Sequence, residues 1–263
     1  MLALVEYAPA AAQLWRRFFP RKPVLTPDAV LGLRVLRACV DSERSAARYA
    51  RELARAGADR VCFAADFPFR AAFGDFPEAR TEGLMQAFLP ELADALSVPG
   101  GAAYLCGSAG DAETFRRLYL KNRYVLTDMP RGGALTREAR RAAGVSVLEN
   151  PSPARILTAT LAVFTREPAR PVTLGRECVA VAPRAAYLER VAHTRRVYGI
   201  AVDFGGDLRV PEPPPCFPRA ALLTEAYLRG GVSRREIRLR AIKILTKDGN
   251  NTIITRIVLT RDA

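Results

Sequence analysis

Residues 102–128 read AAYLCGSAGDAETFRRLYLKNRYVLTD, and this stretch decides the fold. An apolar run over 102–106 is followed by a glycine-containing turn, an amphipathic segment over 111–121 and a second apolar run over 124–128. Short runs that are apolar along their whole length are typical of strands buried on both faces, and the amphipathic segment between them predicts a connecting helix. Strands joined by helices in this way predict a parallel sheet.

The same alternation continues on both sides of that stretch. The fold predicted from the sequence is therefore of the α/β class, a mostly parallel sheet with helices on both faces. The remaining expected strands are 33–40, 60–65, 145–148, 176–182 and 197–203, and the remaining expected helices are 42–56, 81–97, 136–143, 152–165 and 184–193.

Two architectures satisfy this pattern. A Rossmann-like open sheet would bind ligands at the carboxyl ends of its strands. A (β/α)8 barrel is the alternative, because about eight strands fit into a chain of 263 residues. The units between residues 124 and 148 are too short for an even eightfold repeat, and the C-terminal part differs from the rest. Both observations favour the open sheet.

The chain is expected to form one domain with additions at both ends. The parallel α/β domain is predicted over 31–209, and residues 1–30 are predicted to form a docking helix and a link. Residues 210–263 are predicted as an extension of the same domain. This extension begins with a proline-rich link over 210–218, which excludes a helix or a central strand, and continues with a helix over 219–229.

A β-hairpin is predicted at the C-terminus, with strands over 236–246 and 251–260 around the turn sequence Lys-Asp-Gly-Asn. Its Arg-bearing face could contact phosphates, a partner chain or a second copy of the protein, and it could also guard an edge against aggregation. Alternate residues of the first strand would face opposite ways: Ile237 and Leu239 on one side, Arg238 and Arg240 on the other.

The net charge of +13 raises nucleic acid as a partner. Only four of the 40 basic residues are Lys, and Ala is frequent as well. A GC-rich coding sequence produces this joint excess of Arg and Ala without any selection for phosphate binding. No block of five or six like charges occurs, so a basic tail is not expected. Charge alone therefore does not favour a specific nucleic-acid role.

The compartment is predicted from apolar runs and cysteines. The apolar runs are far shorter than the roughly 20 residues of a membrane span, and Glu6 interrupts the apolar N-terminus, so neither a membrane partner nor a signal peptide is expected. Five cysteines without a C-x-x-C pair predict buried free thiols rather than a zinc site. A cytoplasmic location is the resulting expectation.

The turn between the first two quoted segments is the best candidate for a binding site. Gly107, Ser108 and Gly110 follow a strand and precede a helix, an arrangement that can aim backbone N–H groups at a phosphate. Asp128 lies 21 residues after Gly107, where dinucleotide-binding folds place the carboxylate that meets a ribose hydroxyl. A nucleotide is therefore the cofactor or ligand that this turn suggests, although the full G-x-G-x-x-G pattern is absent.

The same turn has a purely structural interpretation. Asp111 and Glu113 occupy the first turn of the helix, where they suit capping and would repel a phosphate. A second candidate site starts at Asp128 and continues with Arg131 and a glycine pair, and it could hold a polar substrate or form an ordinary solvated loop.

Other polar residues are candidates by position alone, because the carboxyl ends of parallel strands share one edge of a sheet. His193 is the only histidine and is expected late in a helix, so zinc sites that need two histidines are excluded and a surface role is expected. The residues that are candidates by position are Asp66, Glu149, Asn150 and Asp203.

Three functions remain open. The first is a site for a nucleotide or another phosphorylated small molecule at the carboxyl edge of the sheet. The second is a nucleic-acid or protein-binding scaffold that acts through the Arg-bearing hairpin. The third is a catalytically inactive relative of an enzyme fold. No nucleophile or acid–base pair is marked by spacing, so no catalytic residue is predicted.

Overall fold

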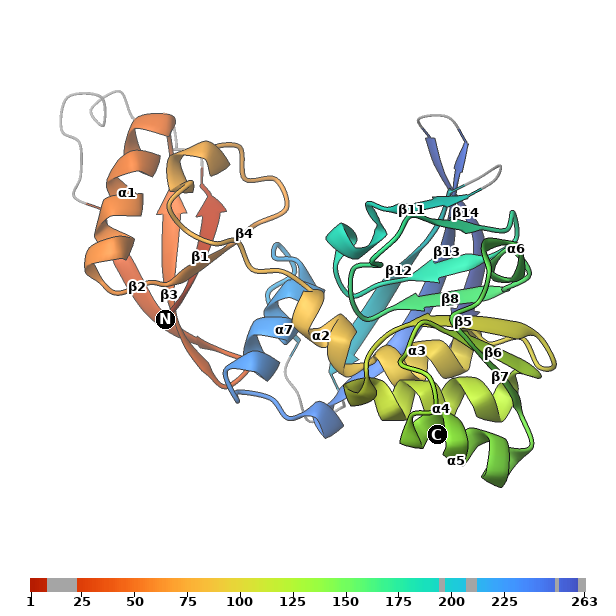
Figure 1. Cartoon of the computed structure of the whole chain (residues 1–263). Helices are drawn as coiled ribbons and strands as arrows, with labels where there is room; N and C mark the ends of the chain where they lie inside the picture. The colour runs from red at the N-terminus through yellow and green to blue at the C-terminus, as the bar shows by residue number, and fades with distance from the viewer. Residues whose placement is uncertain (9–22, 194–196, 207–211, 249–250, 260–263) are drawn as a thin grey trace. The chain divides into compact units, whose positions relative to one another are not determined.

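The computed structural model describes residues 1–8, 23–193, 197–206, 212–248 and 251–259. The chain divides into two compact units. The first unit comprises Met1–Leu84 and Phe204–Arg238, and the second comprises Met85–Asp203 and Leu239–Ala263. This division differs from the one domain that the sequence suggested, because each unit has a sheet of its own (Figure 1).

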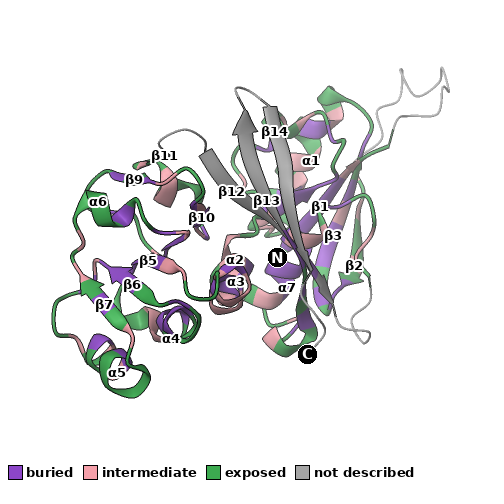
Figure 2. Cartoon of the chain, turned by 90° about the vertical axis from the view of Figure 1, so that its right-hand side faces the viewer, coloured by how far each residue is buried: buried purple, intermediate pink, exposed green. Residues whose placement is uncertain are grey.

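The first unit contains a four-stranded sheet with the order β2-β3-β1-β4. Its central strand β1 (Leu2–Tyr7) runs parallel to β3 (Leu33–Val40) and to β4 (Arg60–Phe63), whereas β2 (Leu25–Val30) runs antiparallel to β3. The sequence did not predict β1 and β2, and the docking helix expected within residues 1–30 falls on residues 9–22, which lie outside the described residues. The first four residues of β1 are buried (Figure 2), as expected of a short apolar run between two neighbouring strands.

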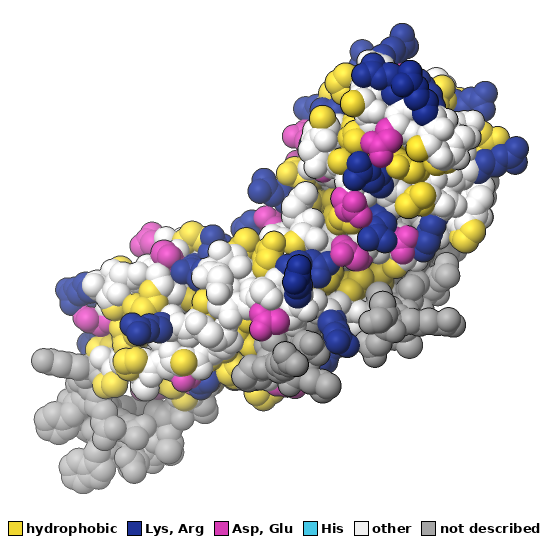
Figure 3. All heavy atoms as spheres, turned by 90° about the horizontal axis from the view of Figure 1, so that it is seen from below, with side chains coloured by type: hydrophobic (Ala, Val, Ile, Leu, Met, Phe, Trp, Pro, Cys, Tyr) yellow, Lys and Arg dark blue, Asp and Glu magenta, His cyan; other side chains and the backbone are white. Residues whose placement is uncertain are grey.

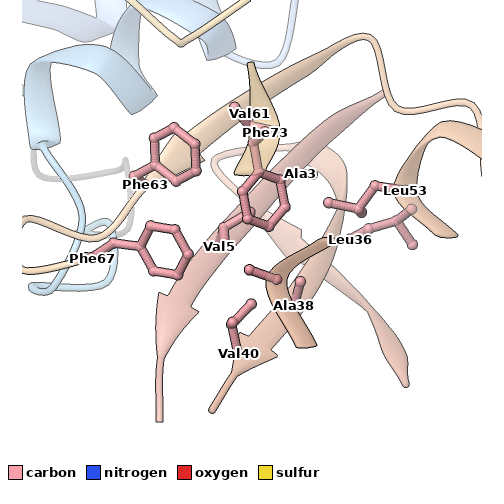
Figure 4. Close-up of a cluster of buried hydrophobic side chains, with 11 residues drawn as sticks. Ala3, Val5, Leu36, Ala38, Val40, Leu53, Val61, Phe63, Phe67 and Phe73 are labelled. Atoms are coloured by element: carbon pink, nitrogen blue, oxygen red, sulfur yellow. The ribbon is translucent and has the colours of Figure 1, made fainter. Parts of the chain in front are cut away.

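Helix α1 (Glu43–Arg55) connects β3 to β4, as the sequence predicted. Ser42 caps its N-terminus by accepting a hydrogen bond from the backbone N–H of Ser45. The buried face of α1 contributes Leu53 to a core that also contains apolar side chains of β1 and β3 (Figure 4). Aromatic residues at the end of β4 and after it complete this core, and they are Phe63, Phe67 and Phe73.

Further helical segments belong wholly or partly to the first unit, among them a 3-10 turn at Arg234–Glu236. Helix α7 (Arg219–Leu228) follows the proline-rich link, as predicted, and a 3-10 turn spans Arg70–Phe73. Helix α2 (Glu82–Ala87) crosses the boundary between the units, and α3 (Leu89–Leu96) follows it in the second unit, so the single helix predicted over 81–97 is divided at Phe88.

The second unit contains a five-stranded, entirely parallel sheet with the order β10-β8-β5-β6-β7. The α/β class with a parallel sheet is thereby confirmed. The sheet is open, so the barrel alternative was wrong. Its strands, in chain order, are β5 (Ala102–Cys106), β6 (Tyr124–Thr127), β7 (Ser146–Glu149), β8 (Leu161–Phe164) and β10 (Val179–Val181).

One face of this sheet is covered by helices α3, α4 (Ala112–Lys121) and α5 (Ala134–Ala143) (Figure 1). The opposite face packs against α6 (Pro153–Ile156) and against the parallel pair β9 (Val172–Leu174) and β11 (Val191–His193). The helices predicted over 152–165 and 184–193 were wrong beyond α6 and a 3-10 turn at Ala185–Leu188. The apolar residues of these two segments instead form β8, which is buried along its whole length, and β11, one strand of the short parallel pair.

A further sheet has the order β12-β13-β14, and the unit boundaries fall within β12 (Val197–Gly206) and β13 (Ile237–Asp248). β14 (Asn251–Leu259) pairs antiparallel with β13, which confirms the predicted hairpin. Ile237 and Leu239 are buried while Arg238 and Arg240 are exposed, in agreement with the expected alternation. No helix among the described residues has both the length and the apolar character needed to cross a bilayer.

Candidate functional site

The candidate site lies in the second unit, where the connections from two neighbouring strands diverge. β5 and β8 are adjacent, but the chain continues from β5 towards β6 on one side of the sheet and from β8 towards β10 on the other. In open α/β sheets, a reversal of this kind creates a crevice at the carboxyl ends of the two strands, where ligands bind. Gly107 directly follows β5, and Thr165 directly follows β8.

Gly107 is buried at the start of the turn, and its surroundings leave little room for a side chain. A Cβ atom built on it would lie 3.1 Å from Oδ2 of Asp111 and 3.2 Å from Oγ1 of Thr165. Both distances are tighter than ordinary van der Waals contact. The backbone N–H of Gly107 donates to Oδ1 of Asp128 at 3.0 Å. The turn after β5 and the carboxylate after β6, which the sequence placed in one site, are therefore in direct contact.

Asp128 also forms an ion pair with Arg166. One guanidinium nitrogen of Arg166 lies 2.6 Å from Oδ2 of Asp128, and its Nε donates to the carbonyl oxygen of Gly107 at 3.2 Å. The side chain of Asp128 is 21% exposed and that of Arg166 is 44% exposed. A pair this open to solvent contributes about 1 kcal/mol or less to stability. A ligand that competes for either residue therefore loses little free energy when it breaks this ion pair.

Asp111 places a second carboxylate at the same edge. Its Oδ2 accepts hydrogen bonds from the backbone N–H of Ser108 at 2.7 Å, from the Ser108 hydroxyl at 3.0 Å and from the Thr165 hydroxyl at 2.8 Å. This carboxylate lies directly before α4, where an isolated helix N-terminus would favour an anion. A phosphate at that position would therefore meet a negative charge already in place.

The loop after β6 is held partly by its own contacts. The backbone N–H of Gly132 donates to Oε1 of Glu149 at 3.0 Å, and Arg140 forms an ion pair with the same carboxylate. A hydrogen bond from Thr136 is the main cause that lowers the pKa of Glu149. Arg131 is exposed and makes no hydrogen bond or ion pair within the described part of the chain, so its guanidinium is available to solvent or to a ligand.

The other residues singled out by position do not all reach this edge. Glu149 ends β7 and Asn150 follows it, at the same edge of the sheet. Asp66 follows β4 and belongs to the first unit, and Asp203 lies within β12, outside the five-stranded sheet. The prediction that they share one edge with Asp128 was wrong, because the strands belong to different sheets.

His193 lies in β11 rather than late in a helix, and its side chain is outside the described set. No group of three or more His, Cys, Asp and Glu residues within the described ranges could hold a metal ion. The site is therefore built from a glycine turn, two carboxylates and arginines.

The cysteines are only partly as predicted. All five are free; Cys62, Cys106 and Cys178 are buried, but Cys39 and Cys216 are exposed. Cys106 lies at the end of β5, with its Sγ 3.4 Å from Oδ2 of Asp128. Burial, followed by the charge of Asp128, raises the pKa of Cys106 to about 12. At neutral pH this thiol is therefore protonated and is not a nucleophile.

Sequence reasoning missed Thr165 and Arg166. Both were placed at the end of or beyond a predicted helix over 152–165, although the run Leu161–Phe164 that precedes them is apolar along its whole length. That run has the same character as the strand before Gly107. Interpreting it as a strand would have placed Thr165 and Arg166 at a carboxyl end beside Gly107.

The fold and the site define an open, parallel α/β sheet with polar residues at the point where its strand order reverses. No protein-family model and no curated protein matches the chain. Among solved structures, the chain is similar to a probable ornithine cyclodeaminase from Bordetella pertussis Tohama I, at 17% identity over 36% of this chain and 35% of that one, with a TM-score of 0.26.

Two further solved structures are similar to larger parts of the chain. L-tryptophan dehydrogenase from Nostoc punctiforme matches at 9% identity over 72% of this chain and 64% of that one, with a TM-score of 0.30. D-lactate dehydrogenase from Escherichia coli matches at 13% identity over 70% and 75%, with a TM-score of 0.32. The chain spans about a third of the length of the ornithine and lysine cyclodeaminases that it matches.

Proposed function

We propose that the second unit binds a nucleotide or another phosphorylated small molecule at the carboxyl edge of its sheet. The observation that carries this proposal is the contact of Gly107, Asp128 and Arg166 at the point where the strand order reverses between β5 and β8. Five free cysteines suit a reducing compartment, and we propose the cytoplasm as the location.

Asp128 is the group that would recognise the hydroxyls of a sugar. An ionised carboxylate has about four acceptor positions, and Asp128 uses one oxygen for Gly107 and the other for Arg166 and the Cys106 thiol. About one acceptor position remains for a ligand hydroxyl group. A ribose hydroxyl is a matching donor.

Arg166 is the group that would recognise the anionic part of the ligand. It uses Nε and one terminal nitrogen, and its other terminal nitrogen has no partner in the described part of the chain. Because Asp111 repels an anion directly before α4, the phosphate would bind on the Arg166 side of the turn. The exposed residues Ser108, Gly110 and Arg131 border this position in sequence and complete the proposed set.

The proposal is tested by calorimetric titration of the full chain with ribose 5-phosphate, AMP and ADP, and with ribose and adenosine as ligands without phosphate. We expect binding of the phosphorylated ligands. Asp128→Asn and Arg166→Gln should each weaken it about tenfold or more, as expected when a charged hydrogen bond is lost.

Matched controls are available on α4, where Arg117 and Glu113 form an ion pair at 3.0 Å that faces solvent. Glu113→Gln and Arg117→Gln change the same charges and should leave binding unaltered. Absence of binding by every phosphorylated ligand would refute the proposal and would favour an inactive relative of an enzyme fold. Equal losses in the control variants would show that charge alone, not this site, governs binding.

A further inference from the structure

Helix α1 of the first unit carries four arginines in one line along its outer side. Arg44, Arg48, Arg51 and Arg55 follow one another at intervals of four, three and four residues. At about 100° per residue these positions fall within an arc of about 60°, and at 1.5 Å per residue they extend over about 17 Å. We call these four residues the arginine stripe.

The stripe faces solvent because the opposite side of α1 is buried. Ala46 and Leu53 of this helix belong to the core of the first unit, and all four arginines are exposed. The helix is therefore held in a fixed rotation that presents the stripe outward. A surface held in this way needs no ordering of the backbone when it binds a partner.

Most of the charge on the stripe is not neutralised. Arg55 is paired with Glu52, and Nε of Arg51 donates to the carbonyl oxygen of Ala47. Arg44 and Arg48 have no ion pair within the described ranges. Elsewhere arginines are often paired: Arg116 with Glu138, Arg117 with Glu113, Arg60 with Glu225 and Arg166 with Asp128.

The rest of the surface gives a useful comparison. On the face drawn in Figure 3, Lys and Arg side chains are interspersed with Asp and Glu rather than gathered into one patch. Of the two carboxylates on α1, Glu43 lies about 80° or more from every arginine of the stripe around the helix axis, whereas Glu52 lies about 40° from Arg48 and pairs with Arg55. The stripe thus carries four positive charges along one line, with one carboxylate at its border.

We propose that the arginine stripe binds the sugar-phosphate backbone of a nucleic acid. Over about 17 Å of helix axis, one strand of B-DNA presents about five phosphates, at 3.4 Å each. Arginine binds phosphate through two parallel hydrogen bonds, a geometry that lysine lacks. Because contacts to phosphate carry no sequence information, binding through the stripe to the backbone would be independent of sequence.

An anionic membrane surface fits the stripe less well. Helices that lie on membranes insert an apolar face into the lipid, but the apolar face of α1 is buried in the core of the unit. A membrane would therefore be bound by charge alone. The proposal for the stripe is independent of the proposed ligand site, whose residues belong to the second unit.

The test measures binding of the full chain to a fluorescently labelled 20-base-pair DNA duplex as a function of salt. The variant Arg44→Gln/Arg48→Gln/Arg51→Gln removes three charges from the stripe, and glutamine retains a good helix propensity. We expect weaker binding and a plot of log affinity against log salt whose slope is shallower by about 2 to 3.

The control variant Arg141→Gln/Arg155→Gln/Arg170→Gln removes three exposed arginines of the second unit and lowers the net charge equally. It should retain the affinity and slope of the wild type, while circular dichroism verifies that both variants are folded. Equal losses in the two variants would overturn the proposal in favour of nonspecific charge. Tighter binding to phosphatidylserine vesicles or to poly-glutamate than to the duplex, at equal salt, would overturn it in favour of another partner.

Discussion

Asp128 and Asp111 each collect several hydrogen-bond donors at the edge of the five-stranded sheet, but with different consequences. The partners of Asp128 include an arginine that is half exposed, so this carboxylate remains open to exchange with a ligand. The partners of Asp111 are the backbone and hydroxyl of Ser108 and the hydroxyl of Thr165, and they hold its charge beside the start of α4. At the scale of single residues, we therefore expect Asp111 to decide where an anion can bind.

Replacement of Asp111 by Asn tests this role. The variant removes the negative charge while it keeps one acceptor oxygen, so the phosphorylated ligand should bind more tightly, by about tenfold. The ligand-free protein should be less stable by about 1–2 kcal/mol, because charge-assisted hydrogen bonds are lost. Calorimetric titration and thermal unfolding measure the two effects. Asp94→Asn, which removes a carboxylate paired with Lys121 on α4, is the control, and unchanged or weaker ligand binding by Asp111→Asn would contradict the account.

Cys39 offers a residue-scale prediction in the first unit. Its Sγ lies 3.0 Å from Oε1 of Glu6, and although the residue is exposed, partial desolvation of the thiol together with the hydrogen bond to that carboxylate raises its pKa to about 11. Because only the thiolate reacts, alkylation of Cys39 by iodoacetamide should be slow at pH 8–9 and should accelerate towards pH 11. Mass spectrometry of the labelled peptide follows the rate.

The variant Glu6→Gln removes the negative charge beside the thiol and should shift the alkylation profile of Cys39 to lower pH. Glu43→Gln changes an exposed carboxylate on α1 and should have no effect. A wild-type profile centred near 8.5, the ordinary value for cysteine, would show that Glu6 and burial do not control this group.

At the scale of elements, the sequence predicted those segments whose pattern has one interpretation. β3, β5 and α4 were found within a residue of their expected bounds, because their apolar runs are short and their helical period is clear. The prediction of a helix over 152–165 was wrong because Ala, Ile, Leu and Thr alternate there without a turn signal before β8. That one error removed Thr165 and Arg166 from the predicted site, whereas Gly107 and Asp128 were correctly brought together.

The β2–β3 turn and the end of α7 approach each other closely through two glycines. A Cβ atom on Gly231 would lie 2.6 Å from the carbonyl oxygen of Leu31, and one on Gly32 would lie 2.6 Å from the carbonyl oxygen of Gly231. Gly32 also has a φ of +74°, as a two-residue hairpin turn requires. Only glycine at both positions allows α7 to pack at this distance from the turn.

Gly231→Ala should therefore destabilise the protein by about 1–3 kcal/mol, the usual cost of forcing extra volume into a packed site. Gly74→Ala is the control, because its Cβ would make only ordinary contact and its φ is −58°. Chemical denaturation measures both. A loss for Gly231→Ala no larger than that for Gly74→Ala would show that the two segments separate at no cost.

At the scale of the whole molecule, the chain combines two units with separate sheets. The alternation of strands and helices could not reveal this division, because β3-α1-β4 of the first unit and β5-α4-β6 of the second have the same pattern. Strand β1 was not predicted, because its six residues are interrupted by Glu6 and no turn signal marks them as a separate strand. The chain returns to the first unit within β12, at Phe204, which no local pattern indicates.

The central claim is that the edge of the five-stranded sheet, at the junction of β5 and β8, binds a phosphorylated ligand. The most direct measurement is a titration of the isotopically labelled chain with ribose 5-phosphate, followed by the shifts of backbone amide signals in NMR spectra. The account predicts saturable shifts concentrated at residues 107–111, 128–131 and 165–166. Shifts confined to the first unit, or no shifts at millimolar ligand with this sugar phosphate and with AMP, would contradict it.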